Sequence, residues 1–249
     1  MSYRKRLAER YWSTHYHRFE PTTAAEWDAV VDRIERNFGE FFAGLSKDDP
    51  ILDVPCGVGY LETYLLRNGF TNVRAVDLSE EQLEMARRRL RERELRTERY
   101  VEFLSADAFE FLQRGMSYRA IAVLDFLEHL PKPEIITMLD LCHRALEPGG
   151  LLFLRVSNAE NPLWAASFYR DFTHETPFTS ASLRQCLEVT EFETLTIAYE
   201  VVSTVPTSRL VTRLQQRVRS AGVALLTRLL SMPRAAFAED LVAVARRRA

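Results

Sequence analysis

Three acidic residues and two glycines stand where a parallel sheet would bring them to one edge. Asp53 ends a short apolar run, and Gly57 and Gly59 follow it; Asp77 ends the next apolar run, 18 residues after Gly59, and Asp107 follows the third. Glycine lets the backbone approach a ligand closely, and an acid at the end of the second strand suits a ribose diol. The pattern predicts a nucleoside site at the carboxyl ends of the strands.

Two further stretches hold residues suited to moving a proton. Asp125 and His129 follow the fourth predicted strand, and Asp171 and His174 lie in a later segment between predicted elements. Histidine ionises near neutral pH and acts as a general base when a neighbouring group sets its tautomer. We expect His174 to be this base, with Asp171 or Glu175 as its partner. His129 or Asp125 would line the substrate pocket, and the residues alone leave the choice between the two histidines open.

The elements that would position these residues alternate between strand and helix. Apolar runs and helical spacing predict strands at 51–54, 73–76, 100–104, 120–124 and 151–156, with helices at 59–68, from Ser79 onward and at 135–146. A Ser79-x-x-Gln82 capping box begins the second helix, and Pro148-Gly149-Gly150 ends the third. Repeated units of this kind form a parallel sheet with helices on both faces.

Outside this alternation the pattern changes. Residues 1–45 are rich in aromatic and charged residues and predict a helical lid or cap, with residues 46–249 as the main domain. Residues 158–180 predict a long loop, followed by a helix at 181–189 and strands at 192–202 and 238–247. A helical insertion at 206–235 precedes the final strand.

Composition excludes several classes of protein. The 249 residues are 47% hydrophobic and 27% charged, as in a folded globular protein, and the net charge of −2 offers no excess of positive charge for coating nucleic acid. Three widely spaced cysteines form no zinc pattern and suit a reducing compartment, so we expect a cytoplasmic protein. The chain has neither an apolar signal segment nor an apolar run long enough to span a membrane.

With these motifs in order, the sequence resembles the class I S-adenosylmethionine-dependent methyltransferases between residues 48 and 200. The matching segments are Leu52–Gly59, Ala75-Val76-Asp77-Leu78, Ala106-Asp107-Ala108, Leu124–His129 and Leu146-Glu147-Pro148-Gly149-Gly150. The resemblance implies a Rossmann-like, doubly wound α/β fold of seven strands, mostly parallel with the last antiparallel. It also implies S-adenosylmethionine as cofactor and S-adenosylhomocysteine as product.

The resemblance assigns the first glycine loop to the methionine part of the cofactor. Gly57 and Gly59 would shape this loop, which also contains Pro55 and Cys56. Asp53 would orient the loop or reach the amino group through water. The family often has a glycine where Pro55 stands, and proline fixes φ and removes a donor.

The resemblance assigns the later strand ends to the nucleoside. Asp77, followed by Leu78, would accept both ribose hydroxyls. Asp107 would bind the adenine amino group, and the backbone of Ala108 would contact the ring. The carbonyl of Leu124 would face the methionine ammonium.

A nicotinamide dinucleotide is the rival ligand for this pattern. Its fingerprint requires a third glycine, and this chain has Glu62 at that position. An acid there would repel a pyrophosphate, whereas S-adenosylmethionine carries no phosphate. We therefore expect S-adenosylmethionine.

The acceptor is predicted from the second half of the chain. In-line methyl transfer needs a closely held nucleophile, and an alcohol also needs a base. Residues 156–162 and 171–185 resemble a subgroup of methyltransferases associated with bacterial polysaccharide and O-antigen biosynthesis. This implies a sugar hydroxyl of a glycan or nucleotide-sugar precursor. The alternatives are another small metabolite, an RNA end, or a regulatory module that binds the cofactor without catalysis.

Metal-assisted transfer is a further alternative. Asp125, Glu128, His129 and His174 loosely match a run that some RNA-terminal and quinone-pathway methyltransferases use to hold a divalent ion. We assign no metal site on this basis.

Residues 206–232 combine five arginines with an apolar stripe, and no acidic residue lies between Val201 and Ala238. We expect a cap or dimer helix with a solvated basic face, in a protein that is a monomer or homodimer without a nucleic-acid partner. Docking to an anionic membrane surface or binding a phosphate-bearing acceptor are the alternatives.

Overall fold

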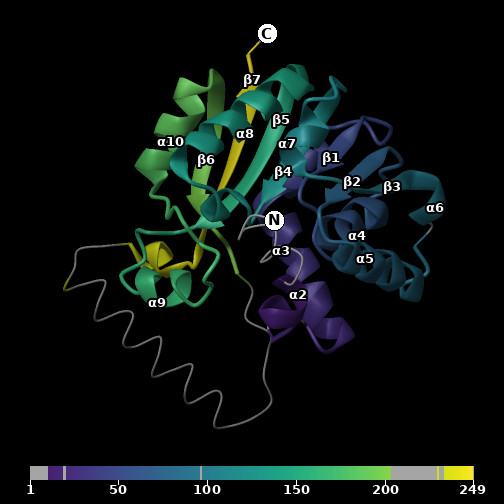
Figure 1. Ribbon diagram of the computed structural model, residues 1–249, viewed down its shortest axis with the longest axis horizontal. Helices are drawn as coiled ribbons and strands as arrows, with labels where there is room; N and C mark the ends of the chain where they lie inside the picture. The colour runs from purple at the N-terminus through teal and green to yellow at the C-terminus, as the bar shows by residue number, and fades with distance from the viewer. Residues whose placement is uncertain (1–10, 19–20, 96, 203–228, 230–232, 249) are drawn as a thin grey trace.

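Seven strands form one sheet in the order β3-β2-β1-β4-β5-β7-β6 (Figure 1). The computed structural model describes residues 11–18, 21–95, 97–202, 229 and 233–248. The strands are β1 Ile51–Asp53, β2 Val73–Asp77, β3 Val101–Ser105, β4 Tyr118–Leu124, β5 Leu146–Ser157, β6 Phe192–Tyr199 and β7 Asp240–Arg247. Strands β1 to β5 pair in parallel, and β7 runs antiparallel between β5 and β6. The predicted Rossmann-like fold with an antiparallel last strand is confirmed.

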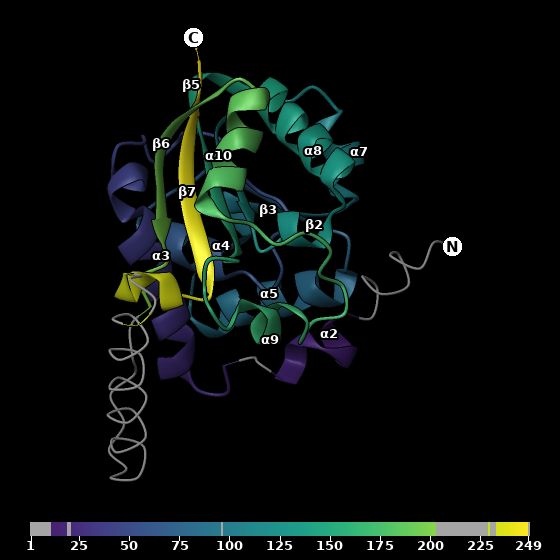
Figure 2. The same cartoon turned by 90° about the vertical axis from the view of Figure 1, so that its left-hand side faces the viewer.

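Helices cover both faces of the sheet (Figure 2). They are α2 Tyr11–Thr14, α3 Ala24–Ala43, α4 Tyr60–Arg67, α5 Glu80–Glu92, α6 Thr97–Tyr100, α7 Ala108–Leu112, α8 Lys132–Ala145, α9 Trp164–Phe168 and α10 Ser180–Val189, with 3-10 turns η1 Tyr16–Arg18, η2 Leu127–His129 and η3 Arg234–Phe237. One buried core joins α7, α8 and α10 to the sheet, and a second joins α3, α4 and α5 to the opposite face. Apolar strands with helices on both faces are the arrangement that an all-parallel core requires.

The helix α3 shows why the amino-terminal segment belongs to this core. Thr23 and Glu26 form a reciprocal capping box at its start. Its buried residues, spaced to face one side, are Trp27, Val31, Ile34, Phe38, Gly39 and Phe42. The ring of Phe42 stacks on Phe153 of β5 with the centroids 4.2 Å apart. The predicted helix is confirmed, and the division of the chain at residue 45 stays a prediction.

Several boundaries differ from the sequence prediction, and the largest shift is in β5, which begins at Leu146 instead of residue 151 and so contains Pro148-Gly149-Gly150. The helix α8 ends at Ala145, three residues before Pro148, because Leu146 is already fully buried and pairs with Tyr118 of β4. Strand β6 ends at Tyr199 instead of reaching residue 202. Residues 158–180 contain the short helix α9 and a parallel bridge between Asn158 and Phe178, so the prediction of one long loop was incomplete.

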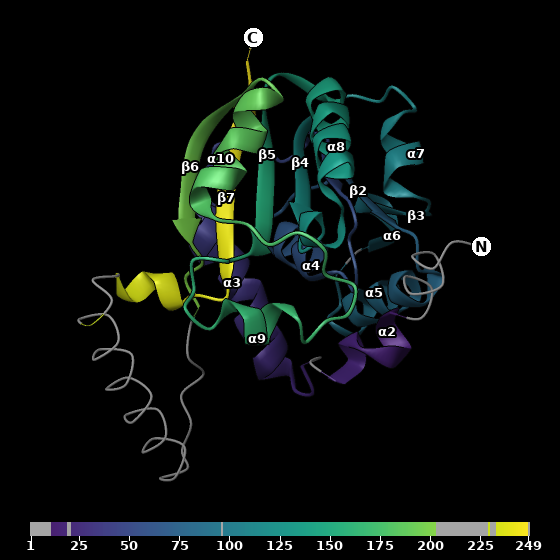
Figure 3. The same cartoon turned by 60° about the vertical axis from the view of Figure 1, so that its left-hand side comes forward.

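The segments α2 and α9 lie beyond the carboxyl edge of the parallel strands (Figure 3). Most of the predicted insertion at 206–235, with its basic stripe, lies outside the described residues. Within the described ranges, no helix has both the length and the apolar character needed to cross a membrane.

We expect Phe42→Ala to lower the free energy of unfolding by about 3–5 kcal/mol, because it removes a fully buried ring and leaves a cavity against Phe153. Glu40→Ala, an exposed position on the same helix, should change it by less than about 0.5 kcal/mol. Urea unfolding measures both values. Equal effects from the two variants would contradict the packing of α3 on the sheet.

Candidate active site

A cavity of about 1260 Å³ opens at the carboxyl edge of the sheet. Nine of the ten predicted cofactor residues line it: Asp53, Pro55, Cys56, Gly57, Asp77, Leu78, Asp107, Ala108 and Leu124. The same cavity is lined by Asp125, His129 and Thr173. The residues predicted to bind the nucleoside and His129, one of the two predicted histidines, therefore line the same cavity.

Gly59, the tenth predicted residue, does not line the cavity but lies where the glycine loop meets the start of α4. It adopts φ +90 as the N-cap of α4, and a Cβ built there would lie 3.0 Å from the Cβ of Ala86 on α5. Gly57 also has positive φ, at +55. The two glycines let the loop turn tightly while α4 and α5 pack close together.

Asp77 connects the first two turns of the sheet. Its Oδ2 accepts a hydrogen bond from the amide of Gly57 at 2.9 Å, and its Oδ1 accepts one from the amide of Ser79 at 2.8 Å. Burial raises the pKa of Asp77, although the amide hydrogen bonds act to lower it. Each carboxylate oxygen has a second lone pair, so Asp77 keeps the capacity to accept hydroxyl donors from the cavity.

Two further acidic side chains lie at and beneath the floor of the cavity. Asp53 is 2% exposed, and Glu62, in the first turn of α4, is fully buried. Carboxyls at Asp53, Glu62 and Asp77 repel a pyrophosphate and suit a cationic ligand, since like charges destabilise one another in a buried site. These residues fit the ammonium and sulfonium of S-adenosylmethionine and do not fit a dinucleotide.

Asp107 has a structural task that the sequence prediction missed. Its Oδ1 accepts hydrogen bonds from the amides of Phe109 at 2.9 Å and Glu110 at 3.1 Å, so it caps α7. An N-cap uses one carboxylate oxygen to satisfy the first helical amides. The residue still lines the cavity, so both roles are compatible.

Asp125 is held by Arg155 of β5 and is not free to act as a base. The Arg155 guanidinium binds both carboxylate oxygens, with Nε 2.6 Å from Oδ1. Burial would raise the pKa of Asp125, but the Arg155 charge outweighs it and the net pKa is lowered. Arg155 also contacts Glu200, which Arg33 of α3 approaches to 3.5 Å. This network connects the amino-terminal helix to the cavity wall.

His129 is oriented by a relay that was not predicted. Its Nδ1 lies 2.7 Å from Oγ1 of Thr173, and this hydroxyl lies 2.6 Å from Oδ1 of Asp171. A carboxylate only accepts, so Thr173 donates to Asp171 and accepts from the Nδ1–H of His129. This tautomer leaves the lone pair on Nε2. Burial and then the neighbouring His174 lower the pKa of His129 to about 4, so the imidazole is neutral at physiological pH.

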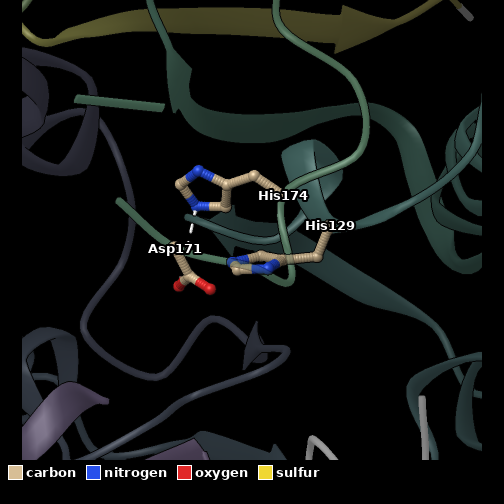
Figure 4. Close-up of side chains that lie close together, drawn as sticks. All are labelled: His129, Asp171 and His174. Carbon is tan, nitrogen blue, oxygen red and sulfur yellow. Dashed lines mark ion pairs between the residues drawn. The ribbon is translucent and has the colours of Figure 1, made fainter. Parts of the chain in front are cut away.

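His174 is not among the residues that line the cavity. Its ring lies close to that of His129 and to the carboxylate of Asp171 (Figure 4). The two rings meet edge to face with centroids 4.6 Å apart, and His174 Nδ1 donates to the carbonyl of Phe168 at 2.8 Å. Its Nε2 lies 3.9 Å from Oδ2 of Asp171, to which His15 comes within 3.4 Å. Asp171 therefore lies close to both His174 and His15 of the amino-terminal segment. Because His174 lies outside the cavity lining, its position does not favour it as the base.

The predicted metal-binding set does not assemble as a set. Ligand atoms of His129, Asp171 and His174 do lie within 4.8 Å of one another. Asp125 is paired with Arg155, and Glu128 is buried, with Oε1 near the hydroxyl of Ser157 at 3.3 Å. Glu128 and His129 do not cap the following helix, because Pro131 is the N-cap of α8.

The main chain of Glu128 anchors the loop that supplies the relay. Its carbonyl accepts hydrogen bonds from the amides of Glu175 at 2.7 Å and Thr176 at 3.0 Å. The sequence patterns did not identify Thr173 or Arg155 as site residues. The polar Arg155 within an otherwise apolar strand was the available signal for one of them, since a buried charge in a central strand needs a partner.

Comparisons with known proteins agree with this geometry. Residues 51–150 match the family model described as "Methyltransferase domain". A ubiquinone biosynthesis O-methyltransferase of Idiomarina loihiensis is 34% identical over 116 residues, which are 46% of this chain and 44% of that protein. The chain thus matches less than half the length of this curated relative. Its name does not support the predicted relation to polysaccharide biosynthesis.

Solved structures share the fold over almost the whole chain. A SAM-dependent methyltransferase from Archaeoglobus fulgidus has a TM-score of 0.63 and 21% identity, covering 93% of this chain and 99% of that one. A magnesium protoporphyrin IX methyltransferase from Synechocystis with bound SAM has a TM-score of 0.65 and 17% identity, covering 99% and 98%. Residues 51–150 thus match a methyltransferase domain, and the chain shares the fold of these two solved methyltransferases.

We expect Gly59→Ala to destabilise the protein more than Gly69→Ala. Both glycines have positive φ, which costs a residue with a Cβ about 1–2 kcal/mol. Only at Gly59 would the new Cβ also press on Ala86, whereas nothing lies within 4 Å at Gly69. The additional cost should be about 1–3 kcal/mol. Urea unfolding measures the difference, and equal losses would contradict the close packing of α4 on α5.

Proposed function

We propose that the protein is an S-adenosylmethionine-dependent O-methyltransferase with His129 as its general base. The observation that carries the proposal is the shared cavity, which brings Asp53, Asp77 and Asp107 together with His129. The match to a methyltransferase domain supports the reaction class, and the name of the curated relative supports oxygen as the methylated atom.

The cofactor would be held by the residues of the first three strand ends. Asp77 would accept the ribose hydroxyls, Asp107 and Ala108 would contact the adenine, and Asp53 would face the methionine ammonium across the Gly57 loop. When bound, S-adenosylmethionine supplies an electrophilic methyl group. The acidic wall favours this cationic ligand before any chemistry begins.

His129 would take the acceptor's proton on Nε2 as the oxygen attacks the methyl group. Asp171, through Thr173, would hold the ring and stabilise the imidazolium that forms. The low pKa of His129 keeps the imidazole neutral over the whole physiological pH range, so Nε2 can accept a proton. Asp125, fixed by Arg155, would act as a positioned anion beside the reacting groups.

An aromatic hydroxyl fits this base better than a sugar hydroxyl. A weak base removes a proton most readily from an acidic hydroxyl, and a phenol ionises near pH 10, well below an aliphatic alcohol. The cavity wall beside His129 includes Phe126, Leu130 and Phe172, which suit a flat apolar ring. We therefore favour a phenolic acceptor over the sugar that the sequence predicted.

Asp77→Asn should weaken binding of S-adenosylhomocysteine about 10- to 100-fold, because it removes the charge that strengthens the bonds to the ribose, worth about 1.5–3 kcal/mol. Asp48→Asn, an exposed change in the turn before β1, is the matched control and should leave the affinity unchanged. Isothermal titration calorimetry gives both constants. Full affinity in Asp77→Asn would count against the ribose assignment.

His129→Gln should lower turnover about 100-fold or more while cofactor affinity stays within about twofold, as expected for loss of a general base. His143→Gln is the control, because His143 lies on α8 against Phe192, outside the cavity. Formation of S-adenosylhomocysteine from a panel of catechols and nucleotide sugars measures turnover and acceptor class together. Turnover with the nucleotide sugars alone would favour the sugar acceptor that the sequence predicted. Unchanged turnover in His129→Gln would contradict the role of His129 as general base.

A further inference from the structure

Asp53 and Glu62 form a pair of buried carboxyls beneath the glycine loop. Asp53 ends β1 and lines the cavity, and Glu62 lies in the first turn of α4 behind it. Their exposed fractions are 2% and 0%. No donor among the described residues reaches Oδ1 of Asp53 or either oxygen of Glu62. The two carboxyls instead lie within hydrogen-bonding reach of each other, and such a bond requires a proton on one of them.

The surroundings supply too little positive charge for both groups to ionise. Asp77 adds a third negative charge, and the thiol of Cys56 is neutral because burial raises its pKa well above the usual range. Arg155 is the cation that acts on Asp53, and its guanidinium is already bound to Asp125 and Glu200.

Burial is the largest cause of the shifted ionisation of this pair. It raises the pKa of Asp53 well above its usual range, and the charge of Glu62 raises it further. Burial also raises the pKa of Glu62, to about 7. Two carboxyls that share a buried site titrate as a unit, and one of them keeps its proton near neutral pH.

We propose that Asp53 and Glu62 share a proton in the free protein and release it when the ammonium of the methionine part binds beside Asp53. The ammonium provides the positive charge that the pair lacks, so the second carboxyl ionises only in the complex. The inference rests on the proposed function, because it needs the amino-acid part of the cofactor in this cavity.

The release of a proton on binding fixes the direction in which cofactor affinity changes with pH. The free pair holds its proton more tightly than the bound pair, so cofactor affinity must rise with pH. For one released proton, the slope approaches tenfold per pH unit at pH values below the ionisation of the free pair. In Glu62→Gln the neighbouring charge is removed and the new amide can donate a hydrogen bond to the Asp53 carboxylate. We therefore expect Asp53 to stay ionised and the affinity to depend much less on pH from 6 to 8 than in wild type.

The test is isothermal titration of S-adenosylhomocysteine into the full chain at pH 7, in phosphate and in Tris. The two buffers differ in ionisation enthalpy, so the difference in heat counts the protons released. We expect wild type to release between about half and one proton and Glu62→Gln to release close to none. Glu81→Gln, an exposed acid on α5, should behave as wild type.

A ligand control keeps the test decisive if Glu62→Gln does not fold. Methylthioadenosine has the nucleoside and the sulfur but no ammonium, so its binding to wild type should release no proton. Equal heats for S-adenosylhomocysteine in the two buffers would overturn the proton-sharing pair and leave the proposed function intact. Equal proton release with both ligands would overturn the role of the ammonium. Absence of S-adenosylhomocysteine binding at any pH would overturn the proposed function itself.

Discussion

The carboxylate of Asp77 accepts hydrogen bonds from the amides of Gly57 and Ser79, and the site is organised around these two bonds. They join the turn after β1 to the turn after β2 and thereby set the shape of the cavity. We propose that the same carboxylate, together with the nearby Asp53, also favours a cationic ligand. A cationic, phosphate-free cofactor satisfies both constraints.

The part of the site around His129 depends on backbone hydrogen bonds to the loop that follows β5. The carbonyl of Glu128 binds the amides of Glu175 and Thr176, and this fixes the loop that carries Asp171 and Thr173. The relay from Asp171 through Thr173 then sets the tautomer of His129. His129 on η2, which we propose as the base, is thus oriented by residues more than 40 positions later in the chain.

Much of the fold and of the cofactor end could be predicted because both depend on local patterns. Apolar runs at strand length and the acids that end them are visible residue by residue, and parallel strands carry them to a common edge. The acceptor end was less predictable, because Thr173 and Arg155 act through contacts distant in sequence. His174 had the right chemistry, but it packs against Phe168 and is not among the residues that line the cavity. The preference for a sugar acceptor came from resemblance alone and has no support in the names of the matched relatives.

A crystal structure with S-adenosylhomocysteine bound would show directly whether Asp77 holds the ribose. We expect the ribose hydroxyls within hydrogen-bonding distance of Asp77, the amino group beside Asp53, and the sulfur facing His129 across the cavity. A ligand whose ribose lies away from Asp77, or density for a pyrophosphate against the Gly57 loop, would contradict this expectation.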